Sequence, residues 1–418
     1  MTRQESNMSS LKYPQVGYKS CKTGNAGFSL IEILVGMVMG LISMVIVMQV
    51  FATFEGQKRT TSSGSDAQTN AGVGLFTVER DIRSAGYGFA DAIGCVVNTA
   101  QPPSPSINGT PGNSFVLAPV TITHTSTIGV PDTISIMTSG NPVDSPAGNL
   151  GWSLPVRQIV AYAAGANSFT TSSTTGINVN DMLIAYETNA ATPPALIKPC
   201  SLVQASAVAP PGTPLDIDFT NGNWNSALPA TSYSTNGLLI DAGSLLVNYY
   251  SVDANNNLIV QQYNTATNSL GAAQIVASDV INLQAQYGFD TRTSAVIATV
   301  CPLGSGSGQC TIVDTWSSAM IDANRDGTIG INGVSNGDAA RIYAVRFAIA
   351  VRSGQKEKPD MQTGVCNTTK VNPTWANGTL TINVDRKPNG TSNPDWMCYR
   401  YKIFETVVPL RNPIWQRQ

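Results

Sequence analysis

The stretch "GFSLIEILVGMVMGLISMVIVMQVF", residues 27–51, decides how the chain begins to fold. Glu32 is its one charged residue, and from Ile33 to Phe54 the sequence carries no charge. As an α-helix, a run of that length covers roughly 33 Å, enough to cross the hydrocarbon core of a bilayer. A secretory signal peptide has a shorter apolar core followed by its small-residue cleavage site, whereas here the small residue, Gly27, precedes the run. We therefore expect a membrane-spanning helix that stays on the mature protein.

Positive charge gathers before this run. Arg3, Lys12, Lys19 and Lys22 outnumber the single acidic residue there, Glu5. By the positive-inside rule, the N-terminal end stays in the cytoplasm and the chain beyond about residue 55 is translocated. The bulk of the protein is then expected on the far side of the membrane.

Glu32 needs an explanation, because a carboxylate inside hydrocarbon costs about 2.5–3.5 kcal/mol and is normally given a partner. The apolar run contains no Lys or Arg. If the bond after Gly27 is cut, Phe28 gains a free α-amine four residues from Glu32. That amine can pair with the carboxylate of its own chain or of a neighbouring subunit. The alternative is an interfacial carboxylate near the end of an ordinary membrane anchor.

The helix is expected to continue beyond the membrane, since no proline lies between Pro14 and Pro102. We expect its second part to pack onto the protein's own β-domain, in preference to a coiled coil with a partner. The glycines of "TSSGSDAQTNAGVG", residues 61–74, predict a bend or a melted turn, because each glycine costs about 1 kcal/mol in a helix. The segment "ERDIRSAGYG", residues 79–88, ends the helix at its glycines. The apolar residues that form one helical stripe at 4-3-4-3 spacing are Ala71, Leu75, Val78, Ile82 and Ala85.

From about Cys95 onward the pattern is one of strands and loops. Residues 243–263 predict two strands around an Asn-rich turn. Residues 280–290 and 341–353 alternate apolar and other side chains at period two, which predicts half-buried strands. The fold class is therefore α+β, with a long N-terminal helix packed on a β-rich C-terminal head. The alternating apolar positions are Ile281, Leu283, Ala285, Tyr287 and Phe289, then Tyr343, Val345, Phe347, Ile349 and Val351. Shorter β-rich runs lie at 114–122, 132–139, 157–164 and 181–188.

Composition excludes several classes of function. Charged residues make up 12% of the chain and the net charge is −2, so nothing predicts a basic surface for nucleic acid. The one histidine, His124, rules out multi-histidine metal sites and argues against histidine-based acid–base catalysis. We expect it in a strand or a turn. The sequence has no nucleophile elbow, P-loop or dinucleotide fingerprint, and we do not expect an enzyme.

Seven cysteines occur without a CxxC motif, which argues against zinc knuckles and thioredoxin-type redox sites. If Cys21 leaves with a leader peptide, six remain, an even number suited to disulfides in an oxidising compartment. Proximity along the chain favours Cys301 with Cys310 and Cys366 with Cys398, which leaves Cys95 with Cys200. Six cysteines allow fifteen connectivities, so other pairings stay open.

The best candidate for ligand binding is "DANRDGTIG", residues 322–330. Oxygen-bearing side chains stand at positions 1, 3 and 5 of an EF-hand-like loop, and glycine takes position 6, where the chain must turn sharply. Position 12 is a glycine where a glutamate belongs, so a later aspartate is needed for the last carboxylate. We expect a weak structural calcium site; the alternative is a polar turn without metal. The candidate ligands are Asp322, Asn324, Asp326, Thr328 through its carbonyl, and Asp338.

The start of the apolar run resembles the prepilin motif of type IV pilins. Gly27 is followed by Phe28, three mostly apolar residues and Glu32, and then by the uncharged run. In that family a membrane aspartyl peptidase cuts after the glycine and N-methylates the new terminal phenylalanine, and the glutamate aids docking into the growing filament. The resemblance implies cleavage at Gly27, methylation of Phe28 and a docking role for Glu32. Met8 is an alternative start, which would shorten the leader.

Four further segments resemble the PilW family of minor pilins. They are "LFTVERDIRSAGYG" at 75–88, "DVINLQAQYGFD" at 279–290, "RIYAVRFAIAVRS" at 341–353 and "YKIFETVVPLRN" at 401–412. The resemblance implies a leader peptide at 1–27, a transmembrane half of the helix at 28–54 and an amphipathic half at 55–88. A β-rich periplasmic or extracellular head then follows at 89–418.

The resemblance also implies a role. The protein would be a minor pilin of a priming or tip complex, anchored in the inner membrane before assembly and found in the pilus at the cell surface afterwards. Its partners would be other minor and major pilins, the prepilin peptidase and the inner-membrane assembly platform. Two alternatives stay open: a minor pseudopilin of a type II secretion system, and a tip adhesin or DNA-uptake subunit that binds through the loops at 100–240.

Overall fold

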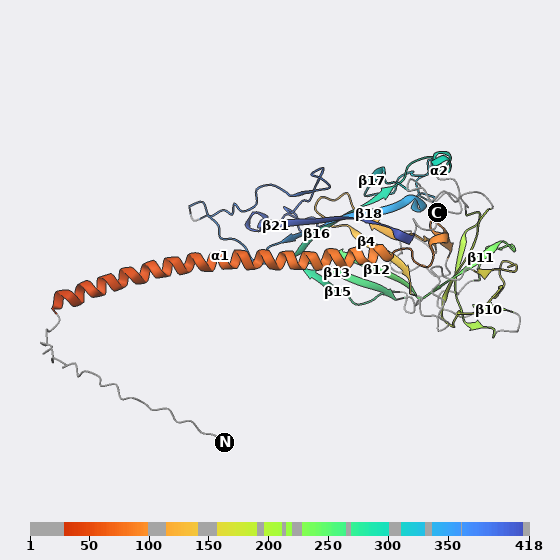
Figure 1. Ribbon diagram of the computed structural model, residues 1–418, viewed down its shortest axis with the longest axis horizontal. Helices are drawn as coiled ribbons and strands as arrows, with labels where there is room; N and C mark the ends of the chain where they lie inside the picture. Colours follow the sequence, from red (N-terminus) through yellow and green to blue (C-terminus); the bar gives the residue numbers. More distant parts are fainter. Residues whose placement is uncertain are drawn as a thin grey trace, which may run out of the picture. The chain divides into compact units, whose positions relative to one another are not determined.

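The structure is a computed structural model of the 418-residue chain. The chain divides into two compact units, residues 1–58 and 59–418. The longest element, α1 (Leu30–Ser84), is one uninterrupted helix whose residues belong to both units (Figure 1). The described strands all belong to the second unit. The residues that the structure describes are 29–98, 114–140, 157–189, 196–210, 215–219, 228–264, 269–300, 311–330, 337–360 and 362–412.

Two sheets form the part of the second unit that receives α1. The first, here called the hairpin sheet, has the order β13-β12-β4-β3, and β14 and β15 follow each other along the outer side of β13. The second, here called the C-terminal sheet, has the order β17-β16-β18-β21. The strands of the hairpin sheet are β3 (Val120–Thr123), β4 (Thr133–Ser139), β12 (Leu245–Val252), β13 (Asn257–Asn264), β14 (Ser269–Leu270) and β15 (Gln274–Ser278). Those of the C-terminal sheet are β16 (Val280–Phe289), β17 (Thr315–Ser317), β18 (Ile342–Arg352) and β21 (Tyr401–Pro409).

A separate group of strands, here called the upstream lobe, precedes β12 in the chain. Its main sheet has the order β2-β1-β8-β7-β11-β5, and a small sheet has the order β6-β10-β9. An aromatic cluster that includes Tyr162, Phe169 and Phe219 fills the core between them. The run at 157–164 is less regular than predicted, because it forms only a two-residue strand and isolated bridges. The strands are β1 (Val96–Asn98), β2 (Ser114–Val116), β5 (Arg157–Gln158), β6 (Ser168–Thr170), β7 (Met182–Glu187), β8 (Cys200–Gln204), β9 (Ala207–Val208), β10 (Asp216–Asp218) and β11 (Gly237–Gly243).

The remaining described elements are short. The helical ones are η1 (Ala90–Ala92), α2 (Ser294–Val300), η3 (Ala339–Arg341) and η4 (Trp396–Cys398), and the strands β19 (Thr374–Trp375) and β20 (Leu380–Thr381) pair with each other.

The upstream lobe and the hairpin sheet share one bent run of chain. β11 pairs in the lobe and β12 pairs in the hairpin sheet, with only Ser244 between them. The bend falls at Gly243, whose φ of +55° is a backbone conformation that side chains other than glycine rarely adopt. Gly140, just after β4, donates its N–H to the Ser244 carbonyl at 2.6 Å. This crossing point fixes the lobe to the sheet that supports α1.

The apolar stripe of α1 is buried against the protein's own sheets, as the spacing predicted. Four of its five residues are fully buried and Leu75 is partly buried. The surrounding core draws side chains from both sheets, including Leu258 of β13 and Ile349 of β18. Complete burial of a side chain such as Val78 or Ile82 contributes about 1.5–3 kcal/mol. The second half of the helix is therefore held mainly by apolar packing.

The glycine-rich segment does not bend or melt α1, contrary to the sequence-based expectation. The helix runs without a break through residues 61–74. Gly74 has a packing role: a Cβ built there would lie 3.1 Å from a methyl carbon of Leu258 and 3.3 Å from the Cβ of Ala277. A close approach to β13 and β15 thus offsets the conformational cost of that glycine. The structure offers no comparable reason for Gly64, which has nothing within 4 Å of an added Cβ.

The alternation predicted for 280–290 is wrong at Ile281, its first apolar position, and correct at the other four positions. Leu283, Ala285, Tyr287 and Phe289 face the helix core, but Ile281 belongs to a cluster on the opposite face of the C-terminal sheet. The cause is an irregularity in the pairing of β16 with β18 between residues 280 and 282, which reverses the faces. The strand β18 is also more than half-buried, since residues 375–384 cover its second face.

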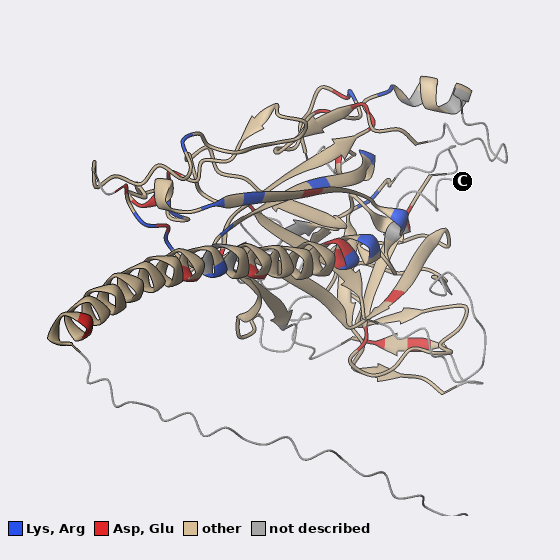
Figure 2. Cartoon of the chain, turned by 60° about the vertical axis from the view of Figure 1, so that its left-hand side comes forward, with Lys and Arg blue, Asp and Glu red and all other residues tan. Residues whose placement is uncertain are grey.

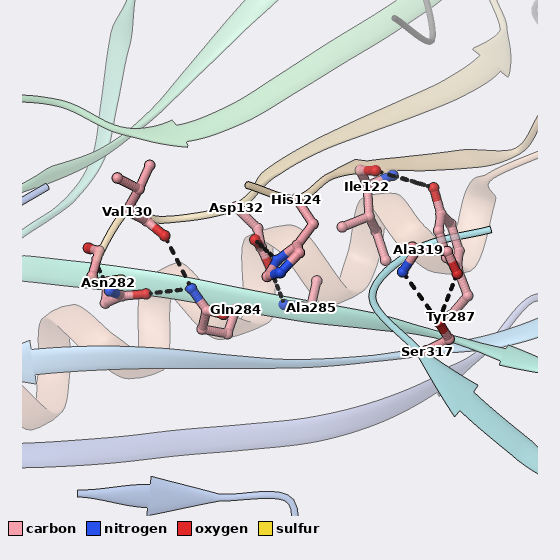
Figure 3. Close-up of polar contacts among 11 residues, drawn as sticks. Ile122, His124, Val130, Asp132, Asn282, Gln284, Ala285, Tyr287, Ser317 and Ala319 are labelled. Atoms are coloured by element: carbon pink, nitrogen blue, oxygen red, sulfur yellow. Dashed lines mark hydrogen bonds and ion pairs between the residues drawn. The ribbon is translucent and has the colours of Figure 1, made fainter. Parts of the chain in front are cut away.

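Polar contacts hold the connection between β3 and β4 against β16 (Figure 3). The buried carboxylate of Asp132 lies 2.7 Å from the His124 ring and accepts the backbone N–H of Ala285 at 2.8 Å. Burial raises the pKa of Asp132, while the bonds to Ala285 and His124 act in the opposite direction. From β16, Asn282 and Gln284 donate to backbone carbonyls of the same connection. The lone histidine, expected in a strand or a turn, lies directly after the end of β3 and has a structural partner.

We expect Gly74→Val to lower the free energy of unfolding by about 1–3 kcal/mol, because the new side chain collides with Leu258 and Ala277. Gly72→Val is the matched control in the same helix, since nothing lies within 4 Å of its added Cβ and valine forms helix slightly better than glycine. Chemical denaturation of the full chain in detergent measures both. Equal effects of the two substitutions would contradict the close packing at Gly74.

Candidate functional site

The part of α1 from Leu30 to Lys58 is long and apolar enough to cross a membrane. Its large apolar side chains are exposed along its whole length, from Leu30 to Phe54. Figure 2 shows one acidic band at the start of the helix and then a long stretch without charge. A helix that is apolar on all sides needs lipid or other apolar helices around it. This segment therefore fits a membrane anchor.

Glu32 lies in the first turn of α1 and is exposed. The turn begins at Ser29, whose carbonyl accepts the N–H groups of Glu32 at 2.9 Å and Ile33 at 3.2 Å. The N-terminal end of a helix carries partial positive charge, which favours a carboxylate at this place. Gly27 and Phe28 lie outside the described residues, so cleavage between them and pairing of a new α-amine with Glu32 stay predictions.

Asp81 ties the second half of α1 to β12. Its carboxylate is almost completely buried and accepts the Tyr250 hydroxyl at 2.5 Å and the Asn248 side-chain amide at 2.9 Å. Burial raises the pKa of the Tyr250 phenol, and the neighbouring Asp81 charge raises it further, so the phenol stays protonated and donates. Arg80 adds a contact at 3.1 Å from the side facing solvent. Sequence reasoning missed this anchor; the signal was an aspartate beside the apolar stripe of an amphipathic helix.

The C-terminal segment caps the end of α1. The last carbonyls of a helix have no partner within the helix. Asn412 donates its side-chain amide to the carbonyls of Ser84 at 3.1 Å and Ala85 at 2.9 Å. Two residues earlier, Leu410 is fully buried in the core around the helix. The last residues of the segment 401–412 thus cap and bury the end of α1, a role that sequence reasoning also missed.

Two disulfides are present among the described residues. Cys95 is bonded to Cys200, and Cys366 to Cys398, and both pairs are among those favoured by the sequence. The first bond joins the segment after α1 to β8 of the upstream lobe, where β1 and β8 run parallel. Cys301 and Cys310 lie outside the described residues.

The calcium-like loop uses its side chains to hold its own backbone. The two oxygens of Asp322 accept the N–H groups of Asp326 and Gly327, each at 3.0 Å. The Asn324 side-chain oxygen also accepts from Asp326, and Asp326 accepts from Thr328. A carboxylate has about four acceptor positions, so the two bonds at Asp322 leave room for a cation there. Among the described residues, no group of three or more His, Cys, Asp or Glu side chains is arranged to hold a metal ion.

Asp338 is used differently from the other candidate ligands. It is fully buried, and its carboxylate accepts three backbone N–H groups, from Ala323 at 2.7 Å, Asn324 at 3.1 Å and Gly330 at 2.8 Å. These bonds hold the two ends of the loop, residues 323–324 and residue 330, to the same carboxylate. Asp322, Asn324, Asp326 and the Thr328 carbonyl therefore stay the candidate ligands, and calcium stays a prediction from the sequence.

The architecture defines an α+β protein in which an N-terminal helix, apolar in its first half, packs its second half on a β-rich head, as in type IV pilin-like proteins. Residues 248–412 match the family model described as Type IV Pilus-assembly protein W. This match covers about two fifths of the chain and supports a PilW-family type IV pilus protein that is involved in type IV pilus assembly. That family is a component of pilus assembly and is not known as an enzyme family. No significantly similar curated protein and no significantly similar solved structure was found.

We expect the loss of Cys95–Cys200, through Cys95→Ser with Cys200→Ser, to lower the free energy of unfolding by about 4.8 kcal/mol. Loss of Cys366–Cys398 should cost about 3.7 kcal/mol, because it closes a loop of 32 residues and the first bond closes one of 105. Denaturation curves of the two double variants measure the difference. The opposite ranking would contradict this entropic account.

We expect calcium to raise the melting temperature of the protein, and Asp326→Ala to abolish that rise, because the loop then loses one of its candidate ligand carboxylates. Asp360→Ala is the matched control, since Asp360 is an exposed aspartate that accepts the N–H groups of Gln362 and Thr363 in an unrelated turn. Thermal melts with calcium and with a chelator give the comparison. A wild-type protein that melts at the same temperature in both removes the calcium site.

Proposed function

We propose that the chain is a minor pilin that enters a priming or tip complex of a type IV pilus after processing by the prepilin peptidase. Cleavage after Gly27 and N-methylation of Phe28 release the leader at 1–27. The helix then waits in the inner membrane with its N-terminus on the cytoplasmic side, and Glu32 helps to seat it against neighbouring subunits. The partners are other minor and major pilins and the inner-membrane assembly platform.

The single observation that carries this proposal is the charge distribution of α1. From Ile33 to Phe54 the helix has no charge and exposes apolar side chains throughout, while Glu32 stands alone in its first turn. A carboxylate kept at the end of such a segment is normally given a partner. An α-amine at Phe28, four residues before Glu32 in the sequence, would supply such a partner after cleavage. The PilW-family match supports an assembly role for the second unit.

A second candidate function rests on the upstream lobe. Its strands lie outside the matched residues 248–412, so they are an addition to the part of the chain that is similar to the family. A lobe of this kind suits a tip subunit that contacts a surface or a ligand. The net charge of −2 disfavours DNA as that ligand. A pseudopilin role in type II secretion is less well supported, because the matched family is a pilus-assembly family.

Mass spectrometry of pili sheared from the cell surface tests the proposal. We expect an N-terminal peptide that begins at N-methylated Phe28, in low abundance beside a major pilin. If residues before Gly27 remain attached in both the pilus and membrane fractions, the processing proposal is wrong. If the processed protein is confined to the membrane fraction and deletion of its gene abolishes protein secretion, the pseudopilin role takes its place.

The same measurement tests Glu32. We expect Glu32→Gln to leave the processed protein in the membrane and to reduce its amount in pili at least tenfold, because the carboxylate that pairs with the amine is lost. Glu55→Gln is the matched control, a carboxylate near the other end of the same helical segment. Normal incorporation of the Glu32→Gln protein would refute the docking role.

A further inference from the structure

Between β18 and β21 the chain forms loops that a disulfide holds together. The Cys366–Cys398 bond joins two of these loops, and Glu357 also donates its backbone N–H to the Cys398 carbonyl at 2.8 Å. The loops joined in this way form one surface of the second unit. They are here called the stapled loops and consist of residues 354–360, 362–371 and 395–400.

Positive charge gathers on and around the stapled loops, although the whole chain has a net charge of −2. Residues 354–402 contain seven Lys or Arg and four Asp or Glu, whereas residues 85–340 contain four Lys or Arg and fifteen Asp or Glu. Two of the acidic groups of the loops already have partners, since Asp395 pairs with Lys356 and Glu357 pairs with Arg400. The surface therefore keeps positive charge for an anionic partner. The exposed lysines that make no ion pair with another described residue are Lys358, Lys370 and Lys402.

The same surface exposes apolar side chains. Val371 directly follows Lys370 and is 77% exposed, and Val365 is 55% exposed. Among the large apolar residues described after Lys58, none is more exposed than Val371. Exposed apolar side chains beside unpaired lysines suit the interface of a membrane, where the apolar groups enter and the lysines stay with the phosphates. A purely electrostatic contact with an acidic protein would have no use for the valines.

Contacts along α1 establish the direction of β18 within the second unit. The first turn of β18 contacts lies near the C-terminal end of α1, because Tyr343 accepts the N–H of Leu410, two residues before the capping Asn412. Farther along β18, a Cβ added to Gly74 would lie 3.6 Å from a methyl carbon of Ile349. β18 therefore runs from the C-terminal end of α1 toward earlier residues of the helix.

The stapled loops follow the end of β18 at Arg352, beyond the level of Gly74. They thus lie toward the part of α1 with which the second unit begins, at Arg59. The apolar segment that fits a membrane anchor ends in the sequence at Lys58. The basic and apolar surface is therefore on the side of the unit where the chain arrives from that segment.

We propose that the stapled loops bind anionic phospholipid headgroups of the membrane that holds α1, with their lysines against the phosphates and Val365 and Val371 in the interface. Such binding combines electrostatic attraction with the burial of apolar area, and this surface offers both. The disulfide and the backbone bonds order the loops before they bind, so little conformational freedom is lost on contact. The inference rests on the membrane anchor of the proposed function and gives the waiting subunit a second, reversible attachment.

Quenching by lipid in nanodiscs tests the proposal with the full chain. A fluorescent amino acid placed at Val371 should be quenched by phospholipids brominated near the headgroup, because this side chain enters the interface. The same amino acid at Val407 is the matched control, since Val407 is 57% exposed and lies about 17 Å beyond Lys402 along β21. The control should be quenched at least fivefold less. Equal quenching at the two positions would overturn the proposal.

The charge of the lipid and of the loops gives an independent readout. Quenching at residue 371 should fall at least fivefold when phosphatidylcholine replaces phosphatidylglycerol, because the attraction of the lysines is lost. Lys358→Gln combined with Lys370→Gln should have an effect of similar size in phosphatidylglycerol. Arg83→Gln combined with Arg411→Gln is the matched control, which removes two exposed positive charges near the other end of the unit and should leave quenching unchanged.

All four substituted residues are exposed, so both double variants should keep the wild-type melting temperature. Quenching that responds neither to the lipid nor to the two lysines would overturn headgroup binding. A benzophenone amino acid at Val371 that crosslinks in the cell to an acidic protein segment and not to lipid would also overturn it, and would assign the surface to a protein partner.

Failure of this inference and failure of the proposed function are distinguishable. If the full chain does not stay in nanodiscs, the membrane anchor of the proposed function is wrong, and headgroup binding fails with it. If the chain stays in nanodiscs and residue 371 is quenched no more than residue 407, the anchor stands and headgroup binding alone is wrong.

Discussion

The docking of α1 against two sheets is the interaction on which the second unit depends. The hairpin sheet and the C-terminal sheet share no paired strand among the described residues, and both contribute side chains to the core around the helix. Val78 and Ile82 are fully buried there. Asp81, in the same turn, is also buried, although its side chain is ionisable. Its burial is tolerable because Tyr250 and Asn248 donate hydrogen bonds to it. The apolar stripe brings the helix close enough for these bonds, and the bonds in turn select one rotation and one axial position of the helix.

The same interaction explains the extent of the family match. The matched region begins at Asn248, which donates to Asp81, and ends at Asn412, which caps the helix. It therefore contains partners of the helix on both sheets, but leaves out the helix itself, the upstream lobe, and β3 and β4, whose residues Ile122 and Ile134 also pack in that core. That lobe is joined to the hairpin sheet by the bend between β11 and β12, by the short connection from β2 to β3, and by a shared core that includes Met137 and Val247. None of these attachments contributes a hydrogen bond to Asp81.

Local periodicity predicted the parts of the fold that obey a simple period. The stripe through Val78 and Ile82 was predicted because helical spacing alone determines it. Three features could not be predicted in this way. The pairing irregularity that turns Ile281 to the other face depends on the partner strand, and the continuity of the helix at Gly74 depends on the close approach of Leu258. The contacts of Asp81 and Asn412 join residues 167 and 328 positions apart, so no local pattern reveals them. For the calcium-like loop, spacing proposed a ligand role for Asp338, but its bonds are to backbone N–H groups.

Under the proposed function, cleavage after Gly27 has two electrostatic effects. It removes the basic residues of the leader, and it creates a positive charge that can pair with Glu32. Before cleavage, the basic residues ahead of Gly27 hold the N-terminal end on the cytoplasmic side, and Glu32 has no cation on its own helix within the next 22 residues. After cleavage, those basic residues are gone and Phe28 carries an α-amine four residues before the carboxylate in the sequence. A single charged side chain at the centre of a membrane helix costs about 2.5–3.5 kcal/mol of insertion free energy. When the amine and the carboxylate are paired, transferring them into an apolar environment costs less than transferring the two unpaired charges. The processed helix is therefore freer to leave the lipid for an environment of other apolar helices, so cleavage would act as the step that permits assembly as well as the one that removes the leader.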